Sequence, residues 1–234
     1  MELIKQRLNY LINGNQHGVS IGWILKNNSV IIDTFNFLKS RGHNVDQVRA
    51  ALDEGRNICI EFVEKSNIHS YDERFNSGPE LAGLLYAFVI LERPKILIET
   101  GVANGLSTNL ILRALEKVGG TLHSFDVDPR VKNVYAGKAD WRLHILGINS
   151  TRNDFKNIVE SIENIDFWLH DSNHGFNWQY FEYKIALSKL NRPRSILISD
   201  DIDASTAWTT TLRENSLISH VIFDKRKFVG IIEL

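Results

Sequence analysis

Residues 96–105 read Ile96-Leu97-Ile98-Glu99-Thr100-Gly101-Val102-Ala103-Asn104-Gly105, and this stretch decides the fold. A short apolar run ends in an acid, and a turn bracketed by two glycines then leads into an amphipathic segment. This order predicts a buried parallel strand that brings a nucleotide-like ligand to a helix N-terminus. Gly101 can adopt a positive φ, and its missing Cβ lets the backbone approach a ligand. An ordinary strand-to-helix turn without a ligand is the alternative.

The composition is that of a globular protein without a nucleic-acid-binding surface. The chain has 234 residues, of which 43% are hydrophobic and 24% are charged. Its formal net charge of -1 leaves no basic excess to neutralise phosphates, so we expect no nucleic-acid partner. The single cysteine, Cys59, has no partner for an internal disulfide, and we expect a buried apolar side chain.

Neither a targeting segment nor a membrane span is predicted. The first residues lack the continuous apolar core of a signal peptide. The longest apolar run, residues 81–91, is well short of the roughly 20 residues that span a bilayer. We therefore expect a cytoplasmic protein that does not contact a membrane.

The chain divides into two parts near residue 75. Residues 1–74 are predicted to form a helical N-terminal extension, with candidate helices at 3–12, 30–38 and 45–52. Glycines follow these helices, and Gly55 is expected to end the third. We expect the extension to serve as a lid or as a dimerisation element, and hence expect a homo-oligomer.

Residues 75–234 have the rhythm of an α/β domain. A helix start is predicted at Ser77-Gly78-Pro79-Glu80. Short apolar strands then alternate with amphipathic helices, which predicts a mainly parallel sheet covered on both faces. The predicted strands are 96–99, 122–126, 143–147, 165–170, 196–199, 220–223 and 228–233. The last two flank a polar turn at 224–227, so they are expected to form an antiparallel hairpin.

This order of elements resembles the Rossmann-like fold of class I S-adenosylmethionine-dependent methyltransferases, with its seven-stranded sheet. The G-x-x-x-G spacing also differs from the G-x-G-x-x-G of dinucleotide enzymes. Asp126 lies 25 residues beyond Gly101, where an acid can accept both ribose hydroxyls. The resemblance implies that Glu99 faces the methionine ammonium group and that Ser150 lies at the adenine. Ser107 and Thr108 are expected to cap the helix after the turn. The expected cofactor-binding residues are Glu99, Gly101, Ala103, Gly105, Ser107, Asp126, Ser150 and Asp171.

Three acids follow the fourth and fifth predicted strands. Asp171 ends one strand, and Asp200 and Asp201 end the next. Neighbouring strands lie about 5 Å apart, so the three carboxylates can converge, and a divalent cation would relieve their repulsion. Metal-dependent O-methyltransferases of the catechol type are similar here, which implies Mg²⁺ bound to the substrate hydroxyl. The alternative is that the acids cap helices or pair with Arg192 or Arg194.

His174 lies three residues beyond Asp171, where catechol-type enzymes have a lysine. The spacing resembles the Asp-x-x-His of bacterial methyltransferases near the macrocin O-methyltransferase and cephalosporin hydroxylase groups. An ordinary histidine pKa of about 6.5 suits a general base. A metal ligand or a loop histidine are the alternatives. Trp208 is expected to border the acceptor site, whereas most aromatic residues of 176–181 are expected to pack on the sheet.

These features together predict an S-adenosylmethionine-dependent O-methyltransferase with an assisting metal. The acceptor is expected to be a hydroxyl of a small molecule, a sugar or a natural product. A metal-independent methyltransferase remains open. A cofactor-binding module without catalysis would not need the three acids, and an NAD-linked oxidoreductase would not be expected to have the closing hairpin.

Overall fold

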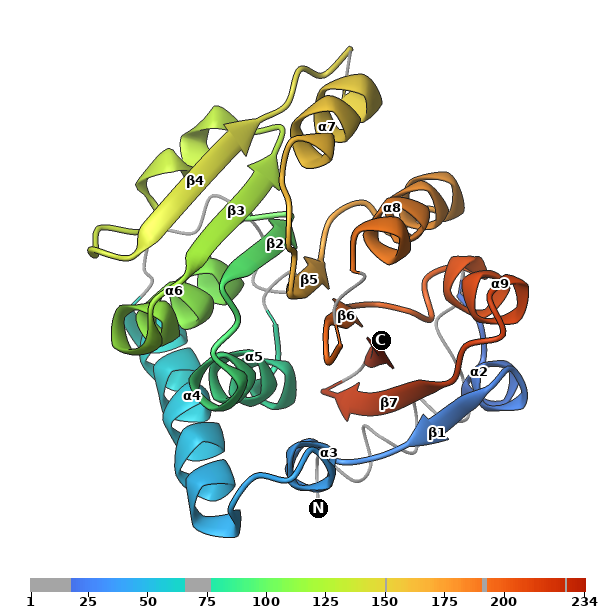
Figure 1. Cartoon of the computed structure of the whole chain (residues 1–234), viewed down its shortest axis with the longest axis horizontal. Coiled ribbons are helices and arrows are strands. Elements are labelled where there is room, and N and C mark those ends of the chain that lie inside the picture. The colour runs from blue at the N-terminus through green and yellow to red at the C-terminus, as the bar shows by residue number, and fades with distance from the viewer. Residues whose placement is uncertain (1–17, 66–76, 150, 191–192, 226) are drawn as a thin grey trace.

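The computed structural model describes residues 18–65, 77–149, 151–190, 193–225 and 227–234, which form a three-layer α/β structure (Figure 1). The described helices are α2 (Ile21–Lys26), α3 (Thr34–Ser40), α4 (Val45–Lys65), α5 (Pro79–Glu92), α6 (Leu106–Val118), α7 (Thr151–Glu160), α8 (Phe176–Lys189) and α9 (Ala207–Glu214), with a 3₁₀ turn η2 at Pro129–Asn133. The described strands are β1 (Ser29–Ile31), β2 (Ile96–Thr100), β3 (Thr121–Asp126), β4 (Asp140–Ile145), β5 (Phe167–His170), β6 (Ile196–Ser199), β7 (Ser219–Asp224) and β8 (Lys227–Glu233).

One sheet joins all these strands in the order β1-β7-β8-β6-β5-β2-β3-β4. Every pairing is parallel except those of β8, which runs antiparallel to both β6 and β7. The predicted mainly parallel sheet with a closing hairpin is confirmed. The sheet has one strand more than the seven predicted, because β1 pairs in parallel with the outer edge of β7.

Alternating side chains of the central strands enter two separate cores. In β5, Phe167 and Leu169 join the core under α3 to α6, whereas Trp168 joins the core under α7 to α9. Figure 1 shows these two groups of helices on opposite faces of the sheet. Strands that are buried on both faces are near-continuously apolar, which is why the sequence revealed them. Within the described residues, no helix combines the length and apolarity needed to cross a membrane.

The N-terminal part differs from its prediction in two places. Residues 29–31 form an edge strand instead of the start of a helix, and α3 begins at Thr34 with Asp33 as its N-cap. Helix α4 continues through Gly55 to Lys65. A Cβ on Gly55 would come within 2.9 Å of the Ala82 carbonyl oxygen in α5, so this glycine permits close helix packing. The predicted helix at 3–12 lies outside the described residues.

The closing hairpin is tied to the start of α5. Asp224, at the end of β7, accepts hydrogen bonds from the backbone N–H groups of Gly78 (2.6 Å) and Glu80 (3.0 Å). A carboxylate is well placed there because it meets the positive end of the helix dipole. The predicted helix start at Gly78-Pro79 is confirmed, with its cap supplied from residue 224.

Candidate active site

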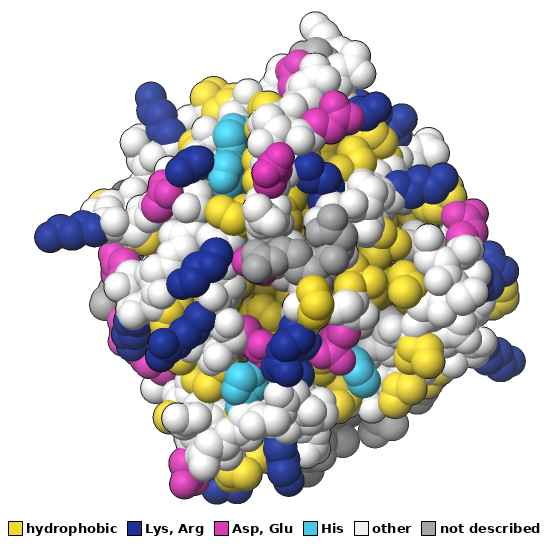
Figure 2. All heavy atoms as spheres, viewed as in Figure 1, with side chains coloured by type: hydrophobic (Ala, Val, Ile, Leu, Met, Phe, Trp, Pro, Cys, Tyr) yellow, Lys and Arg dark blue, Asp and Glu magenta, His cyan; other side chains and the backbone are white. Residues whose placement is uncertain are grey.

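A cavity of about 530 Å³ lies at the carboxyl ends of β2, β3 and β5. Its walls combine the glycine turn after β2, the ends of neighbouring strands and one face of the loop before α8. Figure 2 shows acidic, basic and histidine side chains close together near the centre of the face viewed in Figure 1. Among the predicted site residues, those that line the cavity are Gly101, Ala103, Gly105, Ser107, Asp126, Asp171, His174 and Asp201.

The glycine turn has the conformation that its sequence predicts. Gly101 and Gly105 have φ values of 83° and 85°, in the left-handed region that favours glycine. A Cβ on Gly101 would overlap the carbonyl oxygen of Asp171, because β2 and the end of β5 meet at this point. A Cβ on Gly105 would overlap the side chain of Val134. A side chain at either position would therefore strain the turn and force its neighbours to move.

Glu99 has a different role from the predicted one. It is fully buried, and its carboxylate accepts hydrogen bonds from the hydroxyls of Ser107 (2.7 Å), Thr108 (2.8 Å) and Ser124 (2.6 Å). Burial raises the pKa of Glu99, and these hydrogen bonds offset only part of the rise. The two hydroxyls expected to cap α6 thus bind Glu99, and no side chain caps α6 among the described residues. Glu99 therefore supports the glycine turn and the start of α6 from the buried side.

Asp126 lines the cavity at the tip of β3, as predicted, and it also shapes the glycine turn. Its Oδ2 accepts the backbone N–H groups of Val102 (2.8 Å) and Ala103 (3.2 Å), and its Oδ1 accepts that of Asp128 (2.9 Å). A carboxylate offers about four acceptor positions, so one remains. Binding of two ribose hydroxyls to Asp126 would therefore displace one of the three backbone N–H groups. Ser150 lies outside the described residues.

The three acids after β5 and β6 do converge. Backbone hydrogen bonds continue the ladder beyond the strands, from Asp171 N to Thr100 O (3.0 Å) and from Asp200 N to His170 O (2.9 Å). The side chain of Asp200 is fully buried. Burial, together with the charge of Asp200, raises the pKa of Asp171 well above its ordinary value. The predicted meeting of strand ends is therefore present.

A lysine lies among these acids, and it corrects the metal prediction. Lys227 Nζ forms an ion pair with Asp200 Oδ2 and lies 3.7 Å from Asp201 Oδ2. Within the described residues, no group of three or more acidic, histidine or cysteine side chains has the geometry to hold a metal ion. Three uncompensated carboxylates would favour Mg²⁺, but here an ammonium group already lies among them and compensates part of their negative charge. The donor set of Asp171, Asp200 and Asp201 does not fit the predicted cation.

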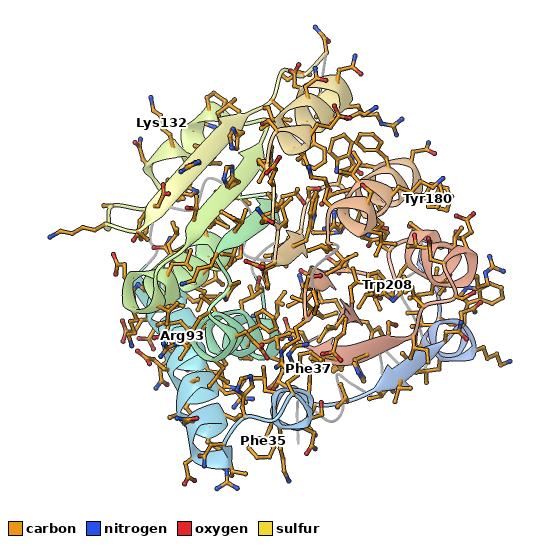
Figure 3. All side chains as sticks on the ribbon, viewed as in Figure 1. Phe35, Phe37, Arg93, Lys132, Tyr180 and Trp208 are labelled. Atoms are coloured by element: carbon orange, nitrogen blue, oxygen red, sulfur yellow. The ribbon has the colours of Figure 1, made fainter. Side chains whose placement is uncertain are left out.

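His174 lies at the same place in an uncharged form. Its Nε2 is 3.6 Å from Asp201 Oδ2 and 4.0 Å from Asp171 Oδ1. Burial, helped by the charge of His170, lowers the pKa of His174 to about 4. A neutral imidazole can accept a proton, and the neighbouring carboxylates would stabilise the imidazolium that forms. Trp208, by contrast, is fully buried on the core side of α9 (Figure 3) and is not among the residues that line the cavity.

Residues 98–202 match a family model that describes a methyltransferase domain. Over this segment the chain is similar to methyltransferase domains. The matched segment begins within β2 and ends after β6, so it contains the glycine turn, Asp126 and the three acids. Lys227 lies beyond it. No curated protein matches the chain.

Solved structures of methyltransferases have a fold similar to that of this chain. An O-methyltransferase from Bacillus cereus, in complex with SAH, is 15% identical with a TM-score of 0.54 over 79% of this chain and 91% of its own. A SAH-bound methyltransferase from Podospora anserina is 14% identical with a TM-score of 0.54, over 78% and 86%. A methyltransferase from Geobacter sulfurreducens is 13% identical with a TM-score of 0.50, over 87% and 99%. These similarities confirm the predicted class I fold.

Glu182 organises the wall of the domain's cavity, and the sequence did not reveal it. It is fully buried in α8, and Oε1 accepts hydrogen bonds from Thr100 Oγ1 (2.7 Å) and Trp168 Nε1 (2.9 Å). Trp178 Nε1 donates to Oε2 (3.0 Å), which also lies 2.8 Å from His170 Nδ1. Burial would raise the pKa of Glu182, but the charge of His170 and the hydrogen bonds outweigh it and lower the pKa. The sequence offers one signal for this role of Glu182, a single acid next to the aromatic residues of a predicted helix.

Proposed function

We propose that the chain transfers the methyl group of S-adenosylmethionine to a hydroxyl oxygen of a small molecule. The observation that supports it is the meeting of three elements at one cavity: the glycine turn, Asp126 at the tip of β3, and Asp171 at the end of β5. The two neighbours solved with SAH have the same fold and support this choice of cofactor.

The cavity residues divide into those that would hold the cofactor and those that would meet the acceptor. Gly101, Ala103, Gly105 and Ser107 form the turn and the start of α6, where backbone N–H groups favour a carboxylate. Asp126 would hold the ribose. Asp171 carries a carboxyl group at the junction of the two sides, next to the backbone of Gly101.

The reaction is an in-line displacement at the methyl carbon. The acceptor oxygen forms the new C–O bond, the C–S bond breaks, and its electron pair returns to sulfur to give the thioether S-adenosylhomocysteine. The acceptor's proton moves to His174, which is neutral at physiological pH because its pKa lies at about 4. Fixing the two reactants in a near-attack geometry supplies much of the rate. No step is assigned to a metal, because the acids do not fit one.

The test is methyl transfer from S-adenosylmethionine labelled in its methyl group to a panel of sugars, phenols and alicyclic alcohols. We expect a labelled O-methyl product and an equal amount of S-adenosylhomocysteine, with the rate strongly reduced in His174→Ala. A protein that methylates only nitrogen or carbon acceptors would contradict the hydroxyl assignment. Binding of S-adenosylhomocysteine without transfer to any acceptor would indicate a cofactor-binding module.

A further inference from the structure

We propose that the ammonium group of Lys227 takes the place of a divalent cation at the reacting end of the cavity and binds the acceptor oxygen there. The proposal rests on the proposed function, and it names the group that meets the acceptor. Its basis is a juxtaposition: Lys227 lines the cavity, and its Nζ contacts acids that follow β6. Lys227 lies outside the segment that matches the methyltransferase family model.

The fold brings Lys227 to the acids through the antiparallel direction of β8. Gly230 is opposite Ser199 at the end of β6, so Lys227, three residues earlier in β8, lies beyond that end. Two hydrogen bonds hold the start of β8 against the loop after β6. They run from Ile202 N to Phe228 O (3.1 Å) and from Phe228 N to Asp203 Oδ1 (3.4 Å). A parallel final strand would have carried this lysine to the opposite edge.

The charges around Lys227 keep it an ammonium ion. The side chain is 9% exposed, and burial alone would lower the pKa of Lys227. The charges of Asp200, Asp171 and Asp201 outweigh burial and raise that pKa, so the group stays protonated. Asp200 is fully buried, and an unpaired carboxylate at that depth would be costly. The acids therefore keep the lysine charged, and the cavity has a fixed positive group.

An ammonium ion in this position can perform the function usually given to a metal. It has three N–H donors, of which Asp200 and Asp201 take up the sides nearest to them. A donor directed into the cavity would lower the pKa of a bound hydroxyl and stabilise the negative charge that develops on its oxygen. His174 lies 3.6 Å from the same Asp201 oxygen, so proton acceptor and cation share one carboxylate. Together they allow a base with a low pKa to deprotonate an alcohol.

The test is a Mn²⁺ titration of the full chain with saturating S-adenosylhomocysteine, in which free Mn²⁺ is followed by electron paramagnetic resonance. Wild type and Lys227→Arg are expected to leave Mn²⁺ free up to millimolar concentration. Lys227→Ala removes the positive charge from among the three acids and is expected to bind Mn²⁺ at least about tenfold more tightly than wild type. Binding of S-adenosylhomocysteine to Lys227→Ala shows that the variant is folded.

Two results would overturn the proposal. One is micromolar Mn²⁺ binding by wild type that Asp201→Asn abolishes, a result that does not require Lys227→Ala to fold. The other is wild-type methyl transfer that EDTA abolishes and Mg²⁺ restores. The proposal expects EDTA to have no effect, and expects Lys227→Met to lower kcat at least about tenfold with unchanged affinity for S-adenosylhomocysteine. A wild type that does not bind S-adenosylhomocysteine would instead remove the proposed function itself.

Discussion

Nζ of Lys227 lies 3.7 Å from Oδ2 of Asp201. The same oxygen lies 3.6 Å from Nε2 of His174, so one carboxylate faces both a fixed cation and a neutral base. These three groups come from three places in the chain: the loop after β5, the loop after β6 and the start of β8. This arrangement determines how the proposed reaction should respond to pH, and it connects the hairpin to catalysis.

His174 is expected to give an unusually acidic pH profile. Its pKa is about 4, so the imidazole is neutral above about pH 5 and can accept a proton there. As the pH falls through 4 the imidazole becomes protonated, and kcat/KM should fall with it. We therefore expect kcat/KM for O-methyl transfer to stay constant from pH 8 down to about 5. A decline centred near 6.5, the ordinary histidine pKa, would contradict the lowered pKa of His174.

Glu182→Gln is expected to destabilise the fold and weaken cofactor binding together. The carboxylate accepts hydrogen bonds from Thr100 and Trp178, which line the cavity, and contacts His170. The substitution removes the negative charge opposite His170, and the amide N–H group of glutamine would face other hydrogen-bond donors. Together these effects should lower the free energy of unfolding by about 3 kcal/mol. Denaturant unfolding and calorimetry with S-adenosylhomocysteine measure the two effects.

The matched control for Glu182 is Glu214→Gln. Glu214 is exposed at the end of α9, where it accepts a hydrogen bond from Tyr180. Removing an exposed charge of this kind should change the free energy of unfolding by no more than about 0.5 kcal/mol. Equal effects of the two substitutions would contradict the organising role of Glu182.

Asp224→Ala is expected to loosen the link between the hairpin and α5. The substitution leaves the backbone N–H groups of Gly78 and Glu80 without their acceptor, which should cost about 1–3 kcal/mol. Asp46→Ala, in the exposed first turn of α4, serves as the control and should have little effect. Thermal unfolding compares the variants. A melting temperature for Asp224→Ala equal to that of Asp46→Ala would contradict the capping role.

Much of the fold could be predicted from the sequence, because the decisive features are local. A strand buried on both faces is apolar along its length, as in residues 96–98, and a turn that needs positive φ displays glycine, as at Gly101. The edge strand β4 was placed too late at 143–147. Its exposure alternates, so its first residues, from Asp140, carry no apolar run.

The errors concern residues whose role depends on a distant partner. The sequence alone predicts that Gly55 ends a helix, because it does not show the close packing of α5 that requires a glycine there. Three acids predict a cation, and the sequence does not show that the cation is Lys227, because only the antiparallel register of β8 brings it there. Glu99 ends a strand as a ligand-binding acid would, yet its hydroxyl partners turn it inward. How residues 1–74 act, as a lid or in a homo-oligomer, stays a prediction.

Calorimetric titration of the full chain with S-adenosylhomocysteine tests the central claim most directly. We expect one binding site in wild type, and at least about a tenfold loss of affinity in Gly101→Ala, whose Cβ would overlap the carbonyl oxygen of Asp171. Gly119→Ala is the matched control, because Gly119 also has a positive φ but open space around it, and it should bind like wild type. Absence of binding by wild type at millimolar ligand, or equal binding by Gly101→Ala, would contradict the account.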